Sequence, residues 1–194
     1  MQPVPDVFTD PIITYDPATG RELCRYDVMT AVDIDELLDH VTTAQKAWAD
    51  TPMEGRKTVL LRTATILRER SEQLGALATA EMGKPITEAI AEVEKCAWVC
   101  EYYAEASPRL LVDEKVAAAG SLSLIRYEPL GTVLAIMPWN YPFWQAFRFI
   151  APTIMAGNAA VLKHSPNVIG VALAIEQLLV EAGLPGGVFR SLVI

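Results

Sequence analysis

Apolar residues in the first half of the chain recur three and four positions apart, with polar residues between them. This spacing places the apolar side chains on one face of an α-helix. It predicts amphipathic helices that run from about 33 to 48, 56 to 69, 72 to 82 and 85 to 106. Asp33, with Glu36 following it in the first turn, predicts a capping box at the start of the first helix. Gly83 is placed to end the third helix in the left-handed conformation.

The second half of the chain alternates short apolar runs with helical periodicity. Partial alternation from Ser121 to Tyr127 predicts a half-exposed strand. Continuous apolar runs predict strands buried on both faces. They occupy 132–137, 159–163 and 188–194, with helices at 142–156 and 168–182 between them. This order predicts a parallel βαβαβ sheet with right-handed crossovers, and so an α/β fold. The N-terminal helices would form a layer over the sheet, preceded by an irregular arm with two short extended pieces in residues 1–31.

Composition narrows the classes of function. The 194 residues are 52% apolar and carry a formal net charge of −8, which suits a globular domain and disfavours nucleic acid or an anionic membrane as a partner. The N-terminus resembles no secretory signal, and the charge-free stretch from Pro129 to Phe147 contains prolines that do not suit a membrane helix. An odd number of cysteines argues against a disulfide framework and for a reducing compartment, so we expect a cytoplasmic protein.

The cysteines and glycines do not form a recognisable reactive site. Cys96 and Cys100 share one predicted helix face, where small buried residues are the simpler interpretation, and no further His or Cys lies at ligand spacing. We therefore expect no metal. The Gly-x-Gly-x-x-Gly motif of many dinucleotide sites is also absent, because the glycines between Gly183 and Gly187 have a different spacing.

The most informative chemistry follows the apolar run 132–137, in Pro138-Trp139-Asn140-Tyr141-Pro142. An asparagine held between two prolines presents an amide at a rigid corner after a strand, where α/β enzymes place catalytic groups. The alternative is an asparagine that only caps the following helix. Lys163 follows the next strand, at the carboxyl edge where open parallel sheets bind ligands, with a solvated lysine as the alternative.

Ordered motifs along the chain resemble those of the aldehyde dehydrogenase family. They are Glu81-Met82-Gly83-Lys84-Pro85, Glu128-Pro129-Leu130-Gly131, Pro138-Trp139-Asn140-Tyr141-Pro142, Ala156-Gly157-Asn158 and Val161-Leu162-Lys163. The resemblance extends from about Ile13 to Ile194. Residues 137–148, together with Leu162-Lys163-His164, are most similar to the succinate-semialdehyde dehydrogenase branch.

The resemblance implies an enzyme that oxidises an aldehyde to an acid with NADP or NAD, through a cysteine thiolate that attacks the carbonyl carbon. It also implies a dinucleotide-binding domain, to which residues 1–118 would contribute the arm and helices and residues 130–194 the βαβαβ part. Residues 119–129 would form a strand of an oligomerisation hairpin, and the catalytic domain would be absent. A full-length chain of this family would be a homo-oligomer, a dimer or a tetramer.

The resemblance assigns roles to residues at the corner and at the sheet edge. Asn140 would donate to the oxyanion that forms when the thiolate attacks the aldehyde. Met137 and Trp139 would offer backbone contacts to the nicotinamide side of the cofactor, with core packing as their alternative role. Lys163 would hold the adenosine ribose of the cofactor.

Further candidates lie beside these positions. Ser165 and Pro166 would border the ribose, and NAD-preferring relatives often carry a glutamate where this chain has Pro166, so its absence keeps NADP and NAD both open. His164 is a polar candidate there, with a helix-start or surface role as the alternative. Arg148 would grip the distal carboxylate of succinate semialdehyde, unless it is a helix-surface residue. Phe149 stands where a basic residue often follows that arginine.

The chain contains no match to the family's catalytic cysteine or general-base glutamate, so we expect no dehydrogenase activity from it alone. A different class of function stays open. In this alternative, the chain is a non-catalytic binding fragment that assembles with a separate C-terminal chain or with a full-length subunit, using the strand at 188–194 as an exposed edge. The expected ligand of the enzyme is a small-molecule aldehyde.

Overall fold

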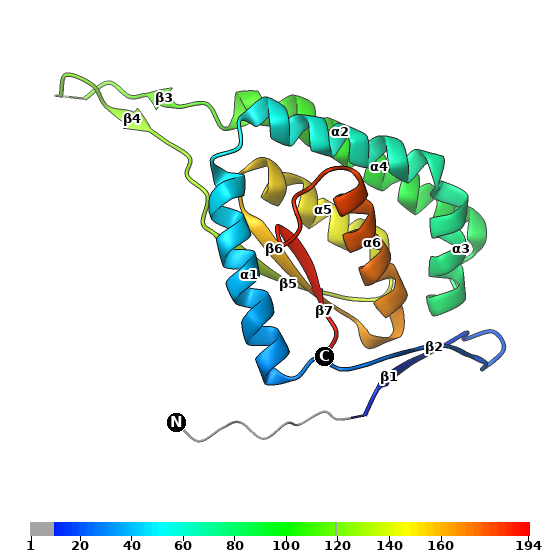
Figure 1. The fold of residues 1–194 in the computed structure, drawn as a ribbon. Helices are drawn as coiled ribbons and strands as arrows, with labels where there is room; N and C mark the ends of the chain where they lie inside the picture. Colours follow the sequence, from blue (N-terminus) through cyan, green and yellow to red (C-terminus); the bar gives the residue numbers. More distant parts are fainter. Residues whose placement is uncertain (1–9, 119) are drawn as a thin grey trace.

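The computed structural model describes residues 10–118 and 120–194, and a parallel sheet with the strand order β5-β6-β7 lies at its centre. β5 (Thr132–Met137), β6 (Ala159–His164) and β7 (Phe189–Leu192) alternate with α5 (Pro142–Met155) and α6 (Ile169–Glu181), and the 3₁₀-helix η1 (Pro166–Val168) leads into α6. The predicted α/β fold with a parallel βαβαβ unit is confirmed (Figure 1).

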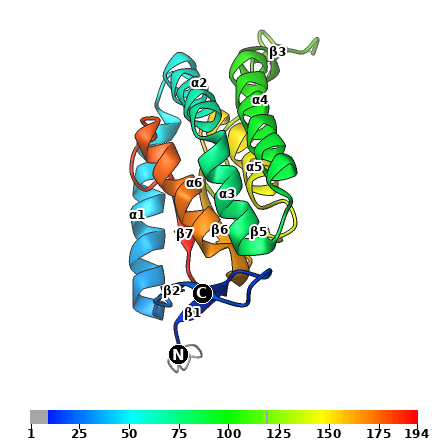
Figure 2. The same ribbon diagram turned by 90° about the vertical axis from the view of Figure 1, so that its right-hand side faces the viewer.

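The N-terminal helices form two layers rather than one. α1 (Ala31–Ala49) packs on one face of the sheet, while α5 and α6 pack on the other face (Figure 2). α2 (Met53–Glu69), α3 (Ser71–Met82) and α4 (Ile86–Leu110) pack against α5 and α6 and so lie outside them. Of the N-terminal helices predicted to form a layer over the sheet, α1 contacts the sheet itself, and α2, α3 and α4 lie over α5 and α6.

β5 lies at one edge of this sheet and exposes one of its faces, so the prediction that it is buried on both faces is wrong. Leu134 is 57% exposed and Ile136 is 71% exposed, whereas Ala135 between them is buried. β6 lies between β5 and β7, and its side chains are largely buried, as predicted. β5 is no less apolar than β6, which ends in Lys163 and His164, but the described part of the chain leaves one face of β5 uncovered.

α1 begins with a capping box that lies earlier than predicted. Thr30 is the N-cap residue, and its hydroxyl accepts a hydrogen bond from the Asp33 N–H at 3.2 Å. In return, Asp33 Oδ2 accepts from the Thr30 N–H at 2.8 Å. The prediction that Asp33 is the cap and Glu36 its partner is wrong, because Asp33 already lies in the first helical turn. Gly83 ends α3 with a φ of 75°, as predicted.

Two hairpins extend from the layered body. β1 (Ile12–Tyr15) pairs with β2 (Glu22–Tyr26), in the arm that was expected to hold two extended pieces. β3 (Glu114–Lys115) and β4 (Leu124–Ile125) form a second arm that projects away from the helices (Figure 1). The strand predicted over 121–127 is thus shorter, and its apolar side chains, among them Leu122, Ile125 and Tyr127, are exposed.

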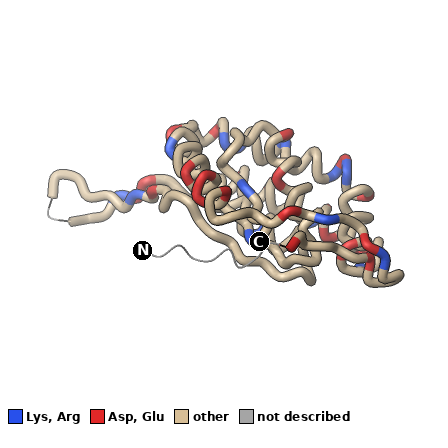
Figure 3. Tube along the Cα trace, turned by 60° about the horizontal axis from the view of Figure 1, so that its bottom comes forward, with Lys and Arg blue, Asp and Glu red and all other residues tan. Residues whose placement is uncertain are grey.

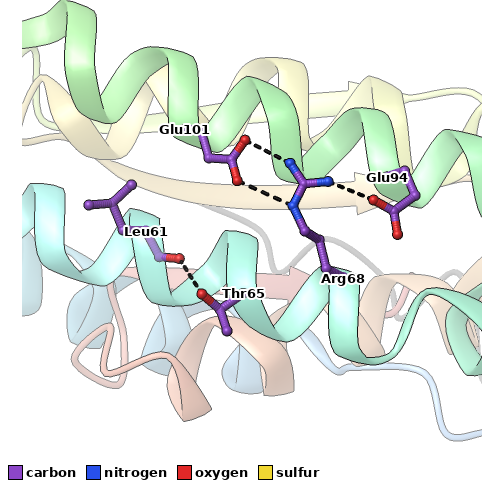
Figure 4. Close-up of polar contacts among 5 residues, drawn as sticks. All are labelled: Leu61, Thr65, Arg68, Glu94 and Glu101. Atoms are coloured by element: carbon purple, nitrogen blue, oxygen red, sulfur yellow. Dashed lines mark hydrogen bonds and ion pairs between the residues drawn. The ribbon is translucent and has the colours of Figure 1, made fainter.

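Residues of both charge signs are interspersed along the described chain rather than gathered by sign. Figure 3 shows segments with Lys and Arg separated along the trace and interspersed with Asp and Glu. In the outer layer, Arg68 of α2 donates to Glu94 at 2.6 Å and to Glu101 at 2.7 Å, both on α4 (Figure 4). Such exposed pairs each stabilise a fold by at most about 1 kcal/mol.

Among the helices of the described residues, none is long and apolar enough to cross a bilayer.

A buried glutamate joins the outer helix α3 to the inner helix α6. No side chain of its own sequence caps α6, so the N–H groups of its first turn need another acceptor. Glu81 accepts from the Gly170 N–H at 2.8 Å and from the Val171 N–H at 2.9 Å. Burial raises the pKa of the Glu81 carboxyl, and the two N–H donors oppose that rise. The helix dipole also favours a carboxylate at this end.

Gly170→Ala should destabilise the fold, although alanine normally favours a helix over glycine. A Cβ atom at position 170 would lie 2.5 Å from Glu81 Oε1 and 3.0 Å from Tyr26 Oη, so the cap must shift. We expect the free energy of unfolding, measured by urea titration, to fall by about 1–3 kcal/mol. Gly186→Ala is the matched control, because its Cβ would meet nothing within 4 Å. Equal stability of the two variants would contradict the role given to Glu81.

Candidate functional site

The predicted corner lies at the carboxyl end of β5, between Met137 and the first residue of α5. Trp139 is 50% exposed, and Asn140 is exposed beside it. Tyr141, rather than Asn140, occupies the N-cap position of α5, and no side chain caps the helix from there. The alternative in which Asn140 only caps the following helix therefore does not hold, and its exposed amide is available to a ligand.

Parallel pairing brings the predicted cofactor residues to the same edge of the sheet. Met137 at the end of β5 is paired with His164 at the end of β6. Lys163 lies between Ile136 of β5 and Leu192 of β7, and it is partly exposed. Because the carboxyl ends of parallel strands share one edge, the corner and Lys163 face the same region, as the sequence predicted.

The turn after β6 completes this edge. Ser165 precedes η1 as its N-cap residue, and its Oγ donates to Asn167 Oδ1 at 2.6 Å. Pro166 is the first residue of η1, so this position offers no carboxylate beside Lys163. The predicted cofactor residues that gather at the edge are Met137, Trp139, Asn140, Lys163, Ser165 and Pro166.

A second buried glutamate holds the start of α5. Glu92 of α4 accepts with Oε1 from the Phe143 N–H at 2.8 Å and from the Trp144 N–H at 2.9 Å. Its other carboxylate oxygen pairs with the ammonium of Lys84. The side chains of Lys84 and Glu92 are only 6% and 2% exposed, so each needs the other to offset the loss of water. The first turn of α5 is thereby fixed to α4.

Two more buried contacts fix the residues that follow Asn140. The Lys84 ammonium lies over the Tyr141 ring, with Nζ 3.8 Å from the ring centroid. The Pro142 carbonyl accepts a hydrogen bond from His164 Nε2 at 3.0 Å. Side chains from the α3–α4 connection, from α4 and from β6 therefore converge on the backbone next to Asn140.

His164 is a buried structural residue rather than a surface or cofactor-binding residue. Its Nε2 donates to a carbonyl, which can only accept, and its Nδ1 accepts from the Ser165 N–H at 2.9 Å. This pair of bonds requires the neutral imidazole with the proton on Nε2. Burial lowers the pKa of His164, which favours the same neutral form.

Sequence reasoning missed the role of Glu92, although a signal is present. The buried face of α4 includes Ala89, Val93, Cys96 and Cys100, and Glu92 falls within this apolar stripe. A charged residue inside such a stripe is a buried group that needs a partner. The pattern could therefore have marked Glu92 as unusual, but not identified the α5 N-terminus as its partner.

A cavity of about 430 Å³ opens beside the corner, between α4 and the start of α5. Tyr141 and Trp144 line it from α5, and Glu88, Glu92 and Lys95 line it from α4. Arg148 is exposed on α5, one helical turn beyond Trp144, and it does not line this cavity. Arg148 therefore lies about 10 Å from Tyr141 along the axis of α5.

Two of the three cysteines are too deeply buried to act as a nucleophile at the corner. Cys96 and Cys100 are fully buried free thiols, and burial raises the pKa of both. Cys24 is an exposed free thiol on β2, in the hairpin whose other strand, β1, packs against η1. Within residues 10–118 and 120–194, no group of three or more His, Cys, Asp or Glu side chains could hold a metal ion.

Comparison with known proteins identifies what this arrangement is similar to. Residues 7–193 match the model of the aldehyde dehydrogenase family. A probable succinate-semialdehyde dehydrogenase [NADP(+)] of Synechocystis sp. is 45% identical over 94% of this chain and 40% of its own length. A succinate semialdehyde dehydrogenase [NAD(P)+] of Escherichia coli is 43% identical over 91% of this chain and 38% of its own length.

Solved structures give the same result. The succinic semialdehyde dehydrogenase of Streptococcus pyogenes in complex with NADP+ has a TM-score of 0.91 at 32% identity, over 94% of this chain and 40% of that one. Indole-3-acetaldehyde dehydrogenase in complex with NAD+ has a TM-score of 0.89 at 32% identity, over 94% of this chain and 38% of that one. The chain spans about 40% of the length of the curated relatives it matches, as their N-terminal portion. These matches confirm the resemblance predicted from the motifs.

Glu92→Gln should destabilise the fold strongly, because it leaves the buried Lys84 ammonium without its counter-charge. We expect the free energy of unfolding to fall by about 3–5 kcal/mol in urea titrations. Glu88→Gln is the control on the same helix, where an exposed carboxylate should change stability by no more than about 0.5 kcal/mol. Adding Lys84→Met to Glu92→Gln should recover part of the loss. Similar stability of the two glutamine variants would remove the Lys84–Glu92 pair from this account.

Acid should destabilise the protein through His164. The folded-state pKa of His164 lies below its unfolded value of about 6.5, so the unfolded chain binds the proton first and stability falls as pH drops below that value. The slope contributed by one histidine approaches about 1.4 kcal/mol per pH unit. Urea titrations between about pH 5 and 7 should show this slope in the wild type and lose it in His164→Gln.

His40→Gln is the control, because His40 and His164 are the two histidines of the chain and His40 is exposed. Glu81, whose raised pKa acts in the opposite direction, is present in every variant. An unchanged slope in His164→Gln, or its loss in His40→Gln, would refute the assignment.

Proposed function

This chain belongs to the aldehyde dehydrogenase family, and we propose that it supplies the oxyanion donor and part of the cofactor site of an NADP- or NAD-dependent aldehyde dehydrogenase. The observation that carries the proposal is the exposed Asn140 amide, held at a corner whose flanking residues are fixed by buried side chains. A preorganised amide donor of this kind stabilises the negative charge that develops on the carbonyl oxygen during nucleophilic attack.

The attacking thiolate comes, in this proposal, from a segment other than residues 1–194. Cys96 and Cys100 are buried with raised pKa values, which suits inert thiols, and Cys24 lies on the β1–β2 hairpin. We therefore propose that the chain alone has no dehydrogenase activity. Free cysteines also favour a reducing, cytoplasmic location.

The residues at the sheet edge fit the ribose end of a dinucleotide better than its phosphates. Lys163 is a partly exposed cation at the carboxyl end of β6, and Ser165 adds a hydroxyl beside it. The N-termini of α5 and α6, where phosphates bind in many α/β folds, are already occupied by Glu92 and Glu81. Met137 and Trp139 would border the nicotinamide, which accepts the hydride when the cofactor is bound. The absence of a carboxylate at Pro166 keeps NADP and NAD both compatible with the site.

The proposed substrate is succinate semialdehyde, which the names of the relatives support. Arg148 would bind the distal carboxylate of the substrate, and its exposed position on α5 leaves the guanidinium free to do so. Residues 1–118 and 130–194 would belong to the cofactor-binding domain. Residues 119–129 would belong to an oligomerisation hairpin, which the exposed apolar side chains of the projecting β3–β4 arm support.

A second candidate function is a non-catalytic fragment that assembles with another polypeptide. One observation favours it: Leu134 and Ile136 expose an apolar face on the edge strand β5. The sequence predicted that such assembly would use the strand at 188–194. This strand is less suitable, because its side chains are largely buried and the Val193 carbonyl already accepts a hydrogen bond from the Met29 N–H at 2.9 Å. This candidate and the first differ in whether aldehyde oxidation requires the chain.

Asn140→Ala should lower kcat for aldehyde oxidation by about 100- to 1,000-fold in the complete enzyme, because one oxyanion donor is lost. Cofactor affinity, measured by fluorescence titration with NADPH, should change little. Gln73→Ala on α3 is the control, because Gln73 is an exposed amide residue far from the corner in the sequence.

A kcat for Asn140→Ala equal to that of Gln73→Ala would exclude Asn140 from the reaction. The purified chain of 194 residues, assayed alone with NADP or NAD and succinate semialdehyde, should give no turnover. Turnover by that chain would contradict the proposal that the attacking thiolate comes from another segment.

A further inference from the structure

The cavity between α4 and α5 contains one cation with no established task. Tyr141 and Trp144 form one wall, and Glu88, Glu92 and Lys95 lie along the opposite wall, in a volume of about 430 Å³. Lys95 is exposed, and its Nζ lies 4.1 Å from the centroid of the Trp144 ring. A cation over the face of a tryptophan is held in place without using up its hydrogen-bond donors.

The charges around the cavity leave the end at Lys95 positive. The Glu92 carboxylate is neutralised by Lys84 and by two N–H donors of α5, so it contributes little free negative charge. Glu88 lies two turns before Lys95 on α4, about 10 Å away along the helix axis. Among the described residues, Lys95 forms no ion pair with Glu88 or with any other carboxylate.

The same end of the cavity lies close to Asn140. Tyr141 directly follows Asn140 as the N-cap residue of α5, and Tyr141 and Trp144 line the cavity together. Lys95 contacts the Trp144 ring and is therefore about one helical turn from the corner. A ligand in the cavity would therefore lie between Lys95 and the residue that follows Asn140.

We propose that Lys95 determines specificity by binding an anionic group, a carboxylate, at the end of the aldehyde substrate remote from its carbonyl. This inference rests on the proposed function and extends it to a residue for which the family resemblance gave no role. Arg148 lies a turn further along α5 and does not line the cavity, so Lys95 is the cation nearer to the corner. Its ammonium would pair with the carboxylate as a point charge, without the fixed fork of a guanidinium.

The first experiment compares substrates that differ only in the remote carboxylate. In the complete enzyme, Lys95→Met should lower kcat/KM for succinate semialdehyde by about 10- to 100-fold, mainly through KM, because a charge-assisted hydrogen bond is lost. The value for butanal should stay within about two-fold of the wild type. Lys95→Arg should retain most of the preference for the semialdehyde, because it keeps the positive charge.

Two controls sharpen this comparison. Lys46→Met removes an exposed lysine of α1 and should leave both substrates unaffected. Arg148→Gln, measured in parallel, separates the contributions of the two cations. A Lys95→Met variant that loses activity on both substrates equally, or on neither, would overturn the proposal.

The second experiment does not depend on catalysis. The indole signal of Trp144 in NMR spectra of the 194-residue chain should shift on titration with succinate and should not shift with butanamide. Lys95→Met should abolish the succinate response. If the complete enzyme oxidises no aldehyde, the proposed function fails, and this titration alone decides the Lys95 proposal. A succinate response that is absent in the wild type, or unchanged in Lys95→Met, would then overturn it.

Discussion

Helix α5 begins directly after the corner that follows β5, and helix α6 begins after the turn that follows β6. Neither helix has an N-terminal cap from a side chain of its own segment. Each takes a carboxylate from the outer helical layer, α5 from Glu92 and α6 from Glu81. Buried N–H groups without acceptors are costly, and so are buried carboxylates without donors. Each half of these contacts therefore requires the other. The outer helical layer therefore helps to position the candidate site, because it fixes the start of α5 and so the location of Asn140.

These contacts also restrict how an anionic ligand can approach the sheet. The positive end of a helix that follows a parallel strand is a common phosphate site. In this chain both such helix ends hold carboxylates, which would repel a phosphate. The groups left at the edge are the Lys163 ammonium and the Ser165 hydroxyl, which suit ribose hydroxyls or a single phosphate at their side. The sequence also lacks the Gly-x-Gly-x-x-Gly motif, which in many folds lets a pyrophosphate approach a helix N-terminus closely.

The uncovered face of β5 lies directly before the corner along the chain. Leu134 and Ile136 are exposed there, and Trp139 continues the exposed apolar surface to Asn140. A polypeptide that covered this face would come next to the Asn140 amide. Any partner bound to this face would thus lie beside the proposed oxyanion donor, which follows the end of β5 at Met137.

The features of this protein that could be predicted from sequence are those set by local patterns. The sequence by itself determined the helices of the first half, the parallel βαβαβ order, the left-handed Gly83 and the gathering of Asn140 and Lys163 at one edge. These features follow from periodicity, turn chemistry and the shared direction of parallel strands. It placed the cap of α1 three residues too late, because Thr30 and Asp33 are both good capping residues and only the backbone decides between them.

Only the tertiary structure decided which faces are covered and which buried charges meet. β5 is no less apolar in sequence than β6, but the helix α1 lies mainly over β6, so one face of β5 stays exposed. Glu92 and the N–H groups that it binds are separated by about fifty residues in the sequence. Lys95 of α4 and Trp144 of α5, which are in contact, have a similar separation. No local pattern encodes such pairs. They exist because packing brings the two helices together, and a buried charge is stable only where that packing supplies its partner.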